Sequence, residues 1–483
     1  MTTTDKVPTG QPAGVGLRSE RGPVLIGLML ATALVALDAT IIATAVPSIV
    51  KDLGHFSQFP WLFSIYLLTQ AVTVPLYGKL ADIVGRRPVL FFGIATFLVG
   101  SVLCGVAWSM PTLILARAVQ GIGAGAVLPM TITIIGDLYS VQERARVQGY
   151  VASVWGVASV VGPTLGGVFS EYLSWRWIFF VNIPLGALAA VMIGRAFHEK
   201  VVRRPHRLDL AGAGLLTLGC SLVILGLLEG GTAWAWSSLT SVLVFVVGVA
   251  ALVAFVLVER RAAEPVLPLW VFSRRVLVGG NLASVTIGVV LIGLTSYVPT
   301  YVQGVLGTGA LVAGFALAAM TVGWPISAAL AGRVYLRIGF RDTALIGSVL
   351  VVVGALLVTL LGTSSPVVAV GAATFFVGLG LGLMSAPVMV AVQSVVDWER
   401  RGVVTATNMF GRNLGSAVGV AVFGAIANSA LGGSSARPPV GELFTAAHHV
   451  FLGVLVAAVV GVAVLLLMPR STTSLDGTPV TSS

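Results

Sequence analysis

Three charged side chains lie inside long apolar stretches of this sequence, and they are the residues most able to do chemistry. Asp38, Arg117 and Arg412 each fall within a run of mostly apolar residues. Asp38 is the only acidic residue that we place well inside such a run, because Glu171 and Glu229 fall near the ends of theirs. A carboxylate surrounded by hydrocarbon is costly and is functional by default. Burial favours its protonated form unless a nearby cation opposes this, so Asp38 is a candidate proton carrier.

The two arginines define the alternatives for Asp38. At a helical rise of about 1.5 Å per residue, Arg117 and Asp38 lie roughly 9 Å and roughly 15 Å from the same side of their helices, which allows a direct or water-bridged pair. Two interpretations stay open: a pair coupled to proton uptake, and a purely structural ion pair. Arg412 lies near mid-depth, where it binds an anionic or polar substrate group, offsets Asp38 or forms a structural pair.

These charges require a membrane-embedded scaffold, which the composition indicates. Hydrophobic residues make up 57% of the chain, charged residues only 10%, and the mean hydropathy is +1.00, whereas about 25% of residues are charged in soluble proteins. Runs of about 20 apolar residues, long enough to cross a bilayer as helices, recur along the chain. We predict 14 of them, at roughly 23–48, 60–82, 88–108, 111–136, 146–171, 174–195, 210–229, 237–258, 275–303, 308–331, 342–362, 365–396, 402–430 and 444–468.

The net charge of +10 indicates topology rather than nucleic-acid binding. If the N-terminus is inside, the connections between helices alternate between the two sides of the membrane. Of the 28 Lys and Arg residues, only Lys51, Arg176 and Arg437 then fall outside, and Arg117 and Arg412 lie within helices. The positive-inside rule expects this asymmetry. We therefore predict a protein of the cytoplasmic membrane with both termini in the cytoplasm and no nucleic-acid partner.

An internal repeat divides the chain into two halves. The stretch 78–87 is echoed by 332–341, with two glycines and an arginine at the same spacing, and the Glu-Arg pair at 143–144 is echoed at 399–400. Duplicated six-helix halves with a site between them are typical of secondary transporters. We expect a polytopic all-α protein, divided as follows: a tail at 1–22, a first half at 23–195, basic linkers with two inserted helices at 196–274, a second half at 275–468 and a tail at 469–483.

The stretch GKLADIVGRRPVL at residues 78–90 resembles the inner-loop signature of the major facilitator superfamily, although Ile83 stands where a basic residue is usual. Gly85 permits a tight turn, and the charges hold that turn at the water surface near helix ends. The resemblance implies a latch that joins the two halves on the inner side and breaks when they move. The alternative is a loop that only sets orientation. The latch residues are Gly78, Asp82, Gly85, Arg86 and Arg87.

Two further stretches are similar to motifs of the fourteen-helix drug:proton antiporters within this superfamily. LDATIIATAVP at 37–47 resembles their first-helix motif, with Ala43 in place of the usual asparagine, and LILARAVQGIGAG at 113–125 resembles their fourth-helix motif. The resemblance implies that Asp38 and Arg117 couple transport to protons. The glycines near Arg117 do not indicate a nucleotide loop, because no strand precedes them.

The fifth helix resembles the motif associated with antiporters rather than symporters. Small residues recur every four positions, which lets another helix approach closely and slide, and a proline adds a bend; ordinary small-residue packing is the alternative. The motif residues are Gly149, Ala158, Gly162, Pro163, Gly166 and Gly167, with Ala158 replacing a glycine. WRWIFFVNIPLG at 175–186 resembles the segment that opens the sixth helix in this branch, and Asn408, Arg412, Gly415 and Gly419 resemble its thirteenth-helix pattern.

Five residues are candidates for the wall of a substrate cavity, with ordinary packing as the alternative for each: Trp155, Trp324, Met384, Asn408 and Arg412. One buried acid against two arginines puts a purely cationic specificity in doubt, so lipids and other neutral or anionic amphiphiles compete with cationic drugs as substrates.

We predict a proton-coupled exporter of amphipathic compounds that works by alternating access, with a passive facilitator as a remote alternative. Its partners are a small amphipathic or lipid-like substrate, protons and membrane lipids, and it acts as a monomer. We expect no bound cofactor, since the proton gradient supplies the energy. Cys104 and Cys220 lie in apolar runs, where a thiol behaves as a small hydrophobe, which argues against a disulfide or a metal site. We see no nucleophile elbow or paired catalytic carboxylates, so we do not expect an enzyme.

Overall fold

The structure is a computed structural model of the chain. It describes residues 16–139, 141–197, 199, 209–231, 233–262, 265–396, 401–431 and 438–470.

Fourteen membrane-spanning segments are found in the described residues, so the predicted fold class is confirmed. The first half contains α1 (Gly22–Leu53), α2 (Phe59–Val84), α3 (Arg86–Gly105), α4 (Met110–Leu138), α5 (Val141–Tyr172), α6 (Trp177–Phe180) and α7 (Asn182–Ala196). The inserted pair is α8 (Leu210–Glu229) and α9 (Leu239–Glu259). The second half contains α10 (Arg275–Gly304), α11 (Ala310–Ile338), α12 (Phe340–Thr359), α13 (Val367–Ser394), α14 (Arg401–Ala430) and α15 (Val440–Leu466).

The sixth span differs from the single helix that the apolar run predicts. It is divided at Val181 into the short α6 and the longer α7, which begins at Asn182. Pro184 explains the break, because its ring clashes with the carbonyl four residues earlier, at Phe180, and it has no N–H to donate. The first turn of α7 therefore lies within the span.

The repeated inner-loop glycines make equivalent turns in the two halves. Gly85 joins α2 to α3 with a φ of 101°, and Gly339 joins α11 to α12 with a φ of 87°. Both values lie in the region that side chains disfavour and glycine tolerates. In each half a single glycine thus reverses the chain between the second and third helices.

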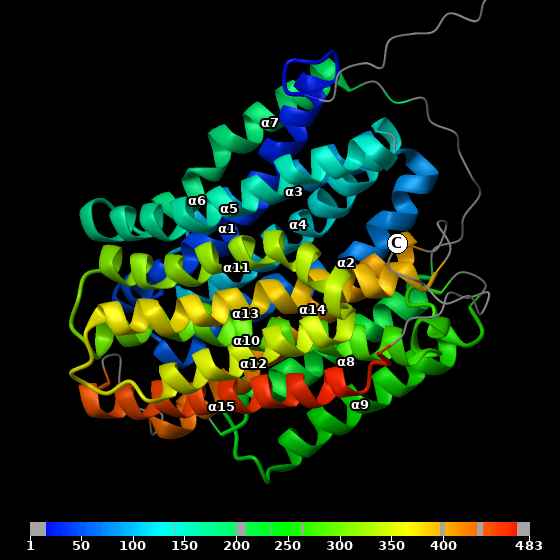
Figure 1. Cartoon of the computed structure of the whole chain (residues 1–483). Coiled ribbons are helices and arrows are strands. Elements are labelled where there is room, and N and C mark those ends of the chain that lie inside the picture. The colour runs from blue at the N-terminus through cyan, green and yellow to red at the C-terminus, as the bar shows by residue number, and fades with distance from the viewer. Residues whose placement is uncertain are drawn as a thin grey trace, which may run out of the picture.

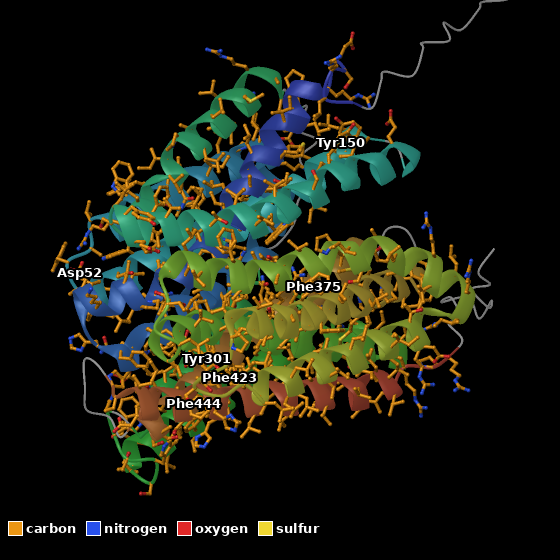
Figure 2. The ribbon with its side chains drawn as sticks, turned by 60° about the vertical axis from the view of Figure 1, so that its left-hand side comes forward. Asp52, Tyr150, Tyr301, Phe375, Phe423 and Phe444 are labelled. Atoms are coloured by element: carbon orange, nitrogen blue, oxygen red, sulfur yellow. The ribbon has the colours of Figure 1, made fainter. Side chains whose placement is uncertain are left out.

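The two halves lie side by side, and their helices diverge toward the end of the molecule where α1 begins (Figure 1). We call this end the inner face and the opposite end the outer face, following the orientation predicted from the charges. The halves are joined mainly by α5 with α11, α2 with α14 and α1 with α10, and α1 also touches α11. Asp52 lies near the outer face and Tyr150 toward the inner face (Figure 2).

The inserted helices cover one of these boundaries. α8 packs against α9, α2 and α14, and Leu216 and Ile224 of α8 share a buried apolar cluster with Leu68 of α2 and Ala417 of α14. At the outer end, Trp61 Nε1 donates to Glu229 Oε1 at 2.9 Å. The pair therefore contacts both halves along the α2–α14 boundary.

The hydrogen bonds made by side chains between the described parts of the two halves all lie toward the outer face. Gln303 Nε2 donates to the Thr44 carbonyl at 3.2 Å, and Asn428 Nδ2 donates to the Ser57 carbonyl at 3.1 Å. The other two join Ser64 to the Ala417 carbonyl and the Leu311 N–H to Glu171. Toward the inner face, the space beside Gly78 and Gly156 is open. The halves are thus held together at the outer face.

Candidate functional site

Asp38 and Arg117 form an ion pair inside the first half. Arg117 Nη1 donates to Asp38 Oδ2 at 2.7 Å, and the two side chains are 1% and 0% exposed. α1 supplies the acid and α4 supplies the base. A buried pair is stable only when further hydrogen bonds satisfy its remaining donors and acceptors.

Gln120 supplies several of those bonds, because it lies one turn after Arg117 on the same face of α4. Its Oε1 accepts from Arg117 Nη1 at 2.6 Å, and its Nε2 donates to Asp38 Oδ1 at 2.8 Å and to Ser101 Oγ at 2.9 Å. One amide therefore contacts both members of the ion pair and also α3.

α2 fixes the other side of the guanidinium. Arg117 Nε donates to the Leu62 carbonyl at 3.1 Å, and the Arg117 Cζ lies 4.0 Å from the centre of the Tyr66 ring. A cation over an aromatic face is attracted by the ring quadrupole, most strongly where water is excluded. Arg117 is thus held by groups from three helices.

Asn182 completes the network from the break in the sixth span. Its Nδ2 lies 3.3 Å from both Asp38 Oδ1 and Ser101 Oγ. Its Oδ1 and the Tyr66 hydroxyl are buried and have no hydrogen-bond partner among the described residues. The Asp38 carboxylate therefore lies among hydrogen-bond donors, with one acceptor beside it, Asn182 Oδ1, that has no described partner.

The small residues of α5 lie against the helix that carries Asp38. A Cβ atom at Gly162 would collide with Thr40, and one at Gly166 would collide with the Ile41 carbonyl. Thr40 Oγ1 donates across this contact to the Ala158 carbonyl at 3.0 Å. Gly167 faces Leu311 of α11 instead, in the other half. Gly149 is the remaining glycine of the motif, and its contacts lie outside the part of the chain that the structure describes.

Arg86 and Arg87 of the predicted latch have described partners within their own half. The Nε of Arg86 lies 3.3 Å from Asp137 Oδ2, and the backbone N–H groups of both arginines donate to Glu199 at 2.9 Å. Arg87 Nη2 also donates to the Gly194 carbonyl at 2.9 Å. The side chain of Asp82 lies outside the described residues. These bonds anchor the α2–α3 turn to α4 and to the end of α7; a contact with the second half stays a prediction.

The structure separates the predicted cavity residues. Trp155 on α5 is 37% exposed, whereas Trp324 is half-buried against the large apolar core. Asn408 is buried between α14 and α10: its Oδ1 accepts from Ser284 and its Nδ2 donates to the Gly280 carbonyl. Asn408 therefore packs within the second half, with its hydrogen bonds satisfied.

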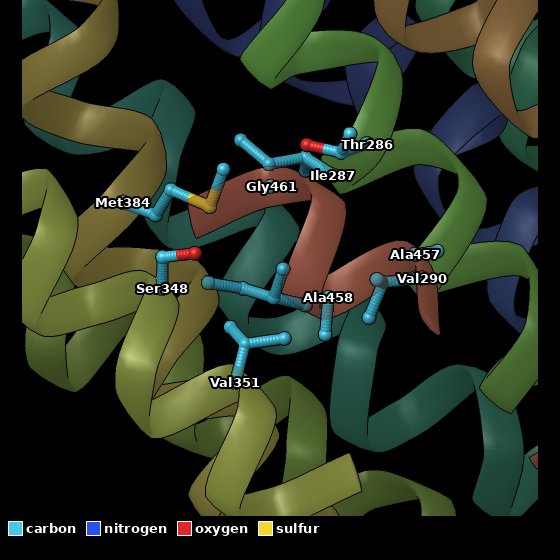
Figure 3. Close-up of a pocket in the computed structure, with 10 residues that line it drawn as sticks. Thr286, Ile287, Val290, Ser348, Val351, Met384, Ala457, Ala458 and Gly461 are labelled. Carbon is cyan, nitrogen blue, oxygen red and sulfur yellow. The ribbon is translucent and has the colours of Figure 1, made fainter. Parts of the chain in front are cut away.

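Met384 is also placed within the second half rather than between the halves. It lines a void between α10, α12, α13 and α15, beside Ser348 and Gly461 (Figure 3). The volume, about 10 Å³, admits at most a water molecule, far below the ~300 Å³ or more of drug-sized sites. Met384 is 3% exposed and serves packing here.

Four residues of the ion-pair network were not among the predicted site residues: Ser101, Gln120, Asn182 and Tyr66. The signal that could have found Gln120 is its position three residues after Arg117, and that for Asn182 is a polar residue followed by a proline inside an apolar run. Ser101 and Tyr66 carry no comparable signal.

Comparison with known proteins assigns the chain to a family. Residues 28–420 match the sequence profile of the Major Facilitator Superfamily. The chain is 35% identical over 417 residues to the multidrug transporter protein MdtP of Bacillus subtilis, covering 86% of this chain and 77% of that protein. It is 35% identical over 403 residues to multidrug resistance protein 3 of the same organism, covering 83% and 79%.

The fold itself matches solved transporters. A D-xylose–proton symporter aligns with a TM-score of 0.64 at 15% identity, over 90% of this chain and 96% of the symporter. The nucleoside transporter NupG aligns with a TM-score of 0.65 at 13% identity, over 92% and 100%.

Proposed function

Because this chain belongs to the major facilitator superfamily, we propose that it is a proton-coupled exporter of amphipathic compounds that works by alternating access. The observation that carries the proposal is the buried Asp38–Arg117 pair with its shared amide, Gln120. The names of the two Bacillus subtilis relatives support export of drug-like molecules.

Proton uptake at Asp38 drives the change in this proposal. The ionised carboxylate accepts from Arg117 and Gln120, and these bonds hold α1 against α4. Protonation removes the negative charge, and with it the attraction to the guanidinium. The new O–H donates to Asn182 Oδ1, the free acceptor, after the Asn182 amide rotates. Arg117 keeps its bonds to Gln120 and to the Leu62 carbonyl.

α1 transmits the change because it touches both halves. It packs against α4 and α5 in its own half and against α10 in the other. The glycine face of α5 lets α1 shift along it without displacing side chains. Loosening α1 from α4 therefore biases how the halves meet at the outer face, where Thr44 of α1 accepts from Gln303.

The proposal includes location and energy source. The chain acts in the cytoplasmic membrane with both termini in the cytoplasm, as the positive-inside distribution supports. It acts as a monomer, without a bound cofactor and without a chemical reaction on the substrate. Protons that enter down their gradient supply the free energy for substrate efflux.

Export from vesicles under an imposed proton gradient tests this function. We expect the parent protein to move a fluorescent amphiphile only while the gradient lasts, and Asp38→Asn to lose this dependence. Asp52→Asn is the matched control, because Asp52 pairs with Arg176 near the outer face, away from the network. If Asp38→Asn exports as well as the parent and still responds to the gradient, Asp38 is not the coupling residue.

A further inference from the structure

Arg412 is a membrane-embedded cation with no described counter-ion. It lies near mid-depth of α14 and is half-buried. Among the described residues its side chain forms no hydrogen bond and no ion pair. It lies deep within the protein, and the residue keeps some accessible surface.

Among the acidic residues of the second half that the structure describes, none pairs with Arg412. The four acids of this half are Asp342, Asp397, Glu399 and Glu442. Asp342 and Glu442 lie in the first turns of α12 and α15, and the other two precede α14 in sequence. Asp397 and Glu399 lie outside the described residues, and Glu399 is 13 residues before Arg412 in the sequence.

Neighbouring polar groups on α14 are already satisfied. Asn408, one turn earlier, bonds to Ser284 and to the Gly280 carbonyl. Ser416, one turn later, donates to the Gly288 carbonyl at 3.0 Å. These bonds fix the side of α14 that packs against α10. The Arg412 guanidinium has no such bond among the described residues.

The charge balance of the embedded residues favours an anion. Asp38 and Arg117 neutralise each other, so Arg412 leaves a net positive charge in a region where charge is costly. An approaching lipophilic cation is repelled by this charge and an anion is attracted. A guanidinium also presents a planar fork that matches a carboxylate or a phosphate.

We propose that Arg412 binds the anionic head of an amphipathic substrate, a carboxylate or a phosphate, and so gives the exporter a preference for amphiphilic anions. This inference rests on the proposed function and specifies its substrate class. A pair with Asp38 in another arrangement of the halves is the competing explanation, and the experiment separates the two.

The experiment compares three probes in vesicles with an imposed proton gradient: a fluorescent long-chain carboxylate, a fluorescent long-chain alkyl phosphate and ethidium, a cation. Variants are Arg412→Gln, Arg412→Lys and the control Arg333→Gln, which alters an exposed arginine of α11. We expect Arg412→Gln to raise the KM of at least one anion about tenfold or more, because the variant loses a hydrogen bond to a charged group. The KM for ethidium should change by about twofold or less. Arg412→Lys should lie between, because it keeps the charge and loses the fork.

A binding measurement on the parent protein covers the case in which Arg412→Gln does not fold. The long-chain carboxylate should bind about tenfold more tightly than its methyl ester, which lacks the charge. Equal binding of acid and ester overturns the inference, as does an equal loss of anion and ethidium transport in Arg412→Gln. The latter result assigns Arg412 to coupling with Asp38. If the parent exports ethidium under the gradient, the proposed function stands in either case. If the parent exports none of the three probes under the gradient, the proposed function itself is overturned.

Discussion

Arg117 and Arg412 are the same residue type, embedded in opposite halves of one transporter fold, and their surroundings differ completely. Arg117 has a carboxylate, an amide oxygen, a backbone carbonyl and an aromatic ring around it. Arg412 has none of these in the described residues. A buried arginine whose donors are all bonded responds to protonation of its acidic partner. An arginine with free donors can bind a mobile anion. In the functions proposed above, this difference corresponds to coupling by Arg117 and recognition by Arg412.

The scaffold beneath this difference is shared. α1 packs on α5 through Gly162 and Gly166, and α10 packs on α14 through Gly288 and Gly415. A Cβ atom at Gly415 would collide with the Val285 carbonyl, just as one at Gly166 would collide with a carbonyl of α1. The two halves thus share this helix packing. Of the two embedded arginines, Arg117 on α4 has an acidic partner, and Arg412 on α14 has none among the described residues.

The largest expected effect comes from removing the charge of Arg117, and Arg412 provides the comparison. Arg117→Met leaves the buried Asp38 side chain without its charged partner, which costs about 3–5 kcal/mol of stability. Arg412→Met should cost far less or stabilise the protein, because it removes an uncompensated charge. Thermal unfolding in detergent, followed by size-exclusion chromatography, measures both. Arg117→Gln with Asp38→Asn is the control, since the double variant removes both charges and should recover much of the loss.

The reverse order, with Arg412→Met the more damaging change, would mean that Arg412 has a counter-ion and would remove the contrast between the two arginines. Equal losses would have the same meaning.

A smaller effect tests the shared scaffold. Gly166→Leu and Gly415→Leu should destabilise the protein to a similar extent, about 1–3 kcal/mol or more, because each side chain is forced into a neighbouring helix. Gly156→Leu on α5 is the matched control, since the space beside Gly156 is open. The same detergent unfolding assay applies. If Gly415→Leu were tolerated like the control while Gly166→Leu was not, the helix pairs would not be equivalent.

Much of this contrast can be predicted from the sequence, and the missing part has a physical reason. Rise per residue fixes depth in a helix, so the sequence allows a direct or water-bridged pair of Asp38 and Arg117, and the structure shows a direct one at 2.7 Å. The contributions of Gln120 and Asn182 depend on how separate helices rotate toward one another, which apolar runs do not encode. Met384 is predicted as a cavity residue for the same reason, because the apolar run does not fix the rotation of its helix. In the structure Met384 faces the interior of its own half.

The smallest expected effect concerns the two inner turns, which share a glycine but not their charges. Arg86 pairs with Asp137, and its N–H donates to Glu199. In the second copy Arg341 has no described ion pair, and the nearby Asp342–Arg470 pair is exposed, with its atoms 4.0 Å apart. Partly exposed ion pairs contribute about 0–1 kcal/mol each.

Arg86→Gln should therefore lower the unfolding midpoint slightly, and Arg341→Gln should leave it unchanged within error. If the first turn also latches the halves, Arg86→Gln should impair transport under the proton gradient more than Arg341→Gln. The reason is that only the first turn has an arginine with a described ion pair. A loss of transport in Arg86→Gln without any change in the midpoint would assign the turn to the conformational cycle. Equal behaviour of both variants in both assays would mean that the charges of this turn serve orientation alone.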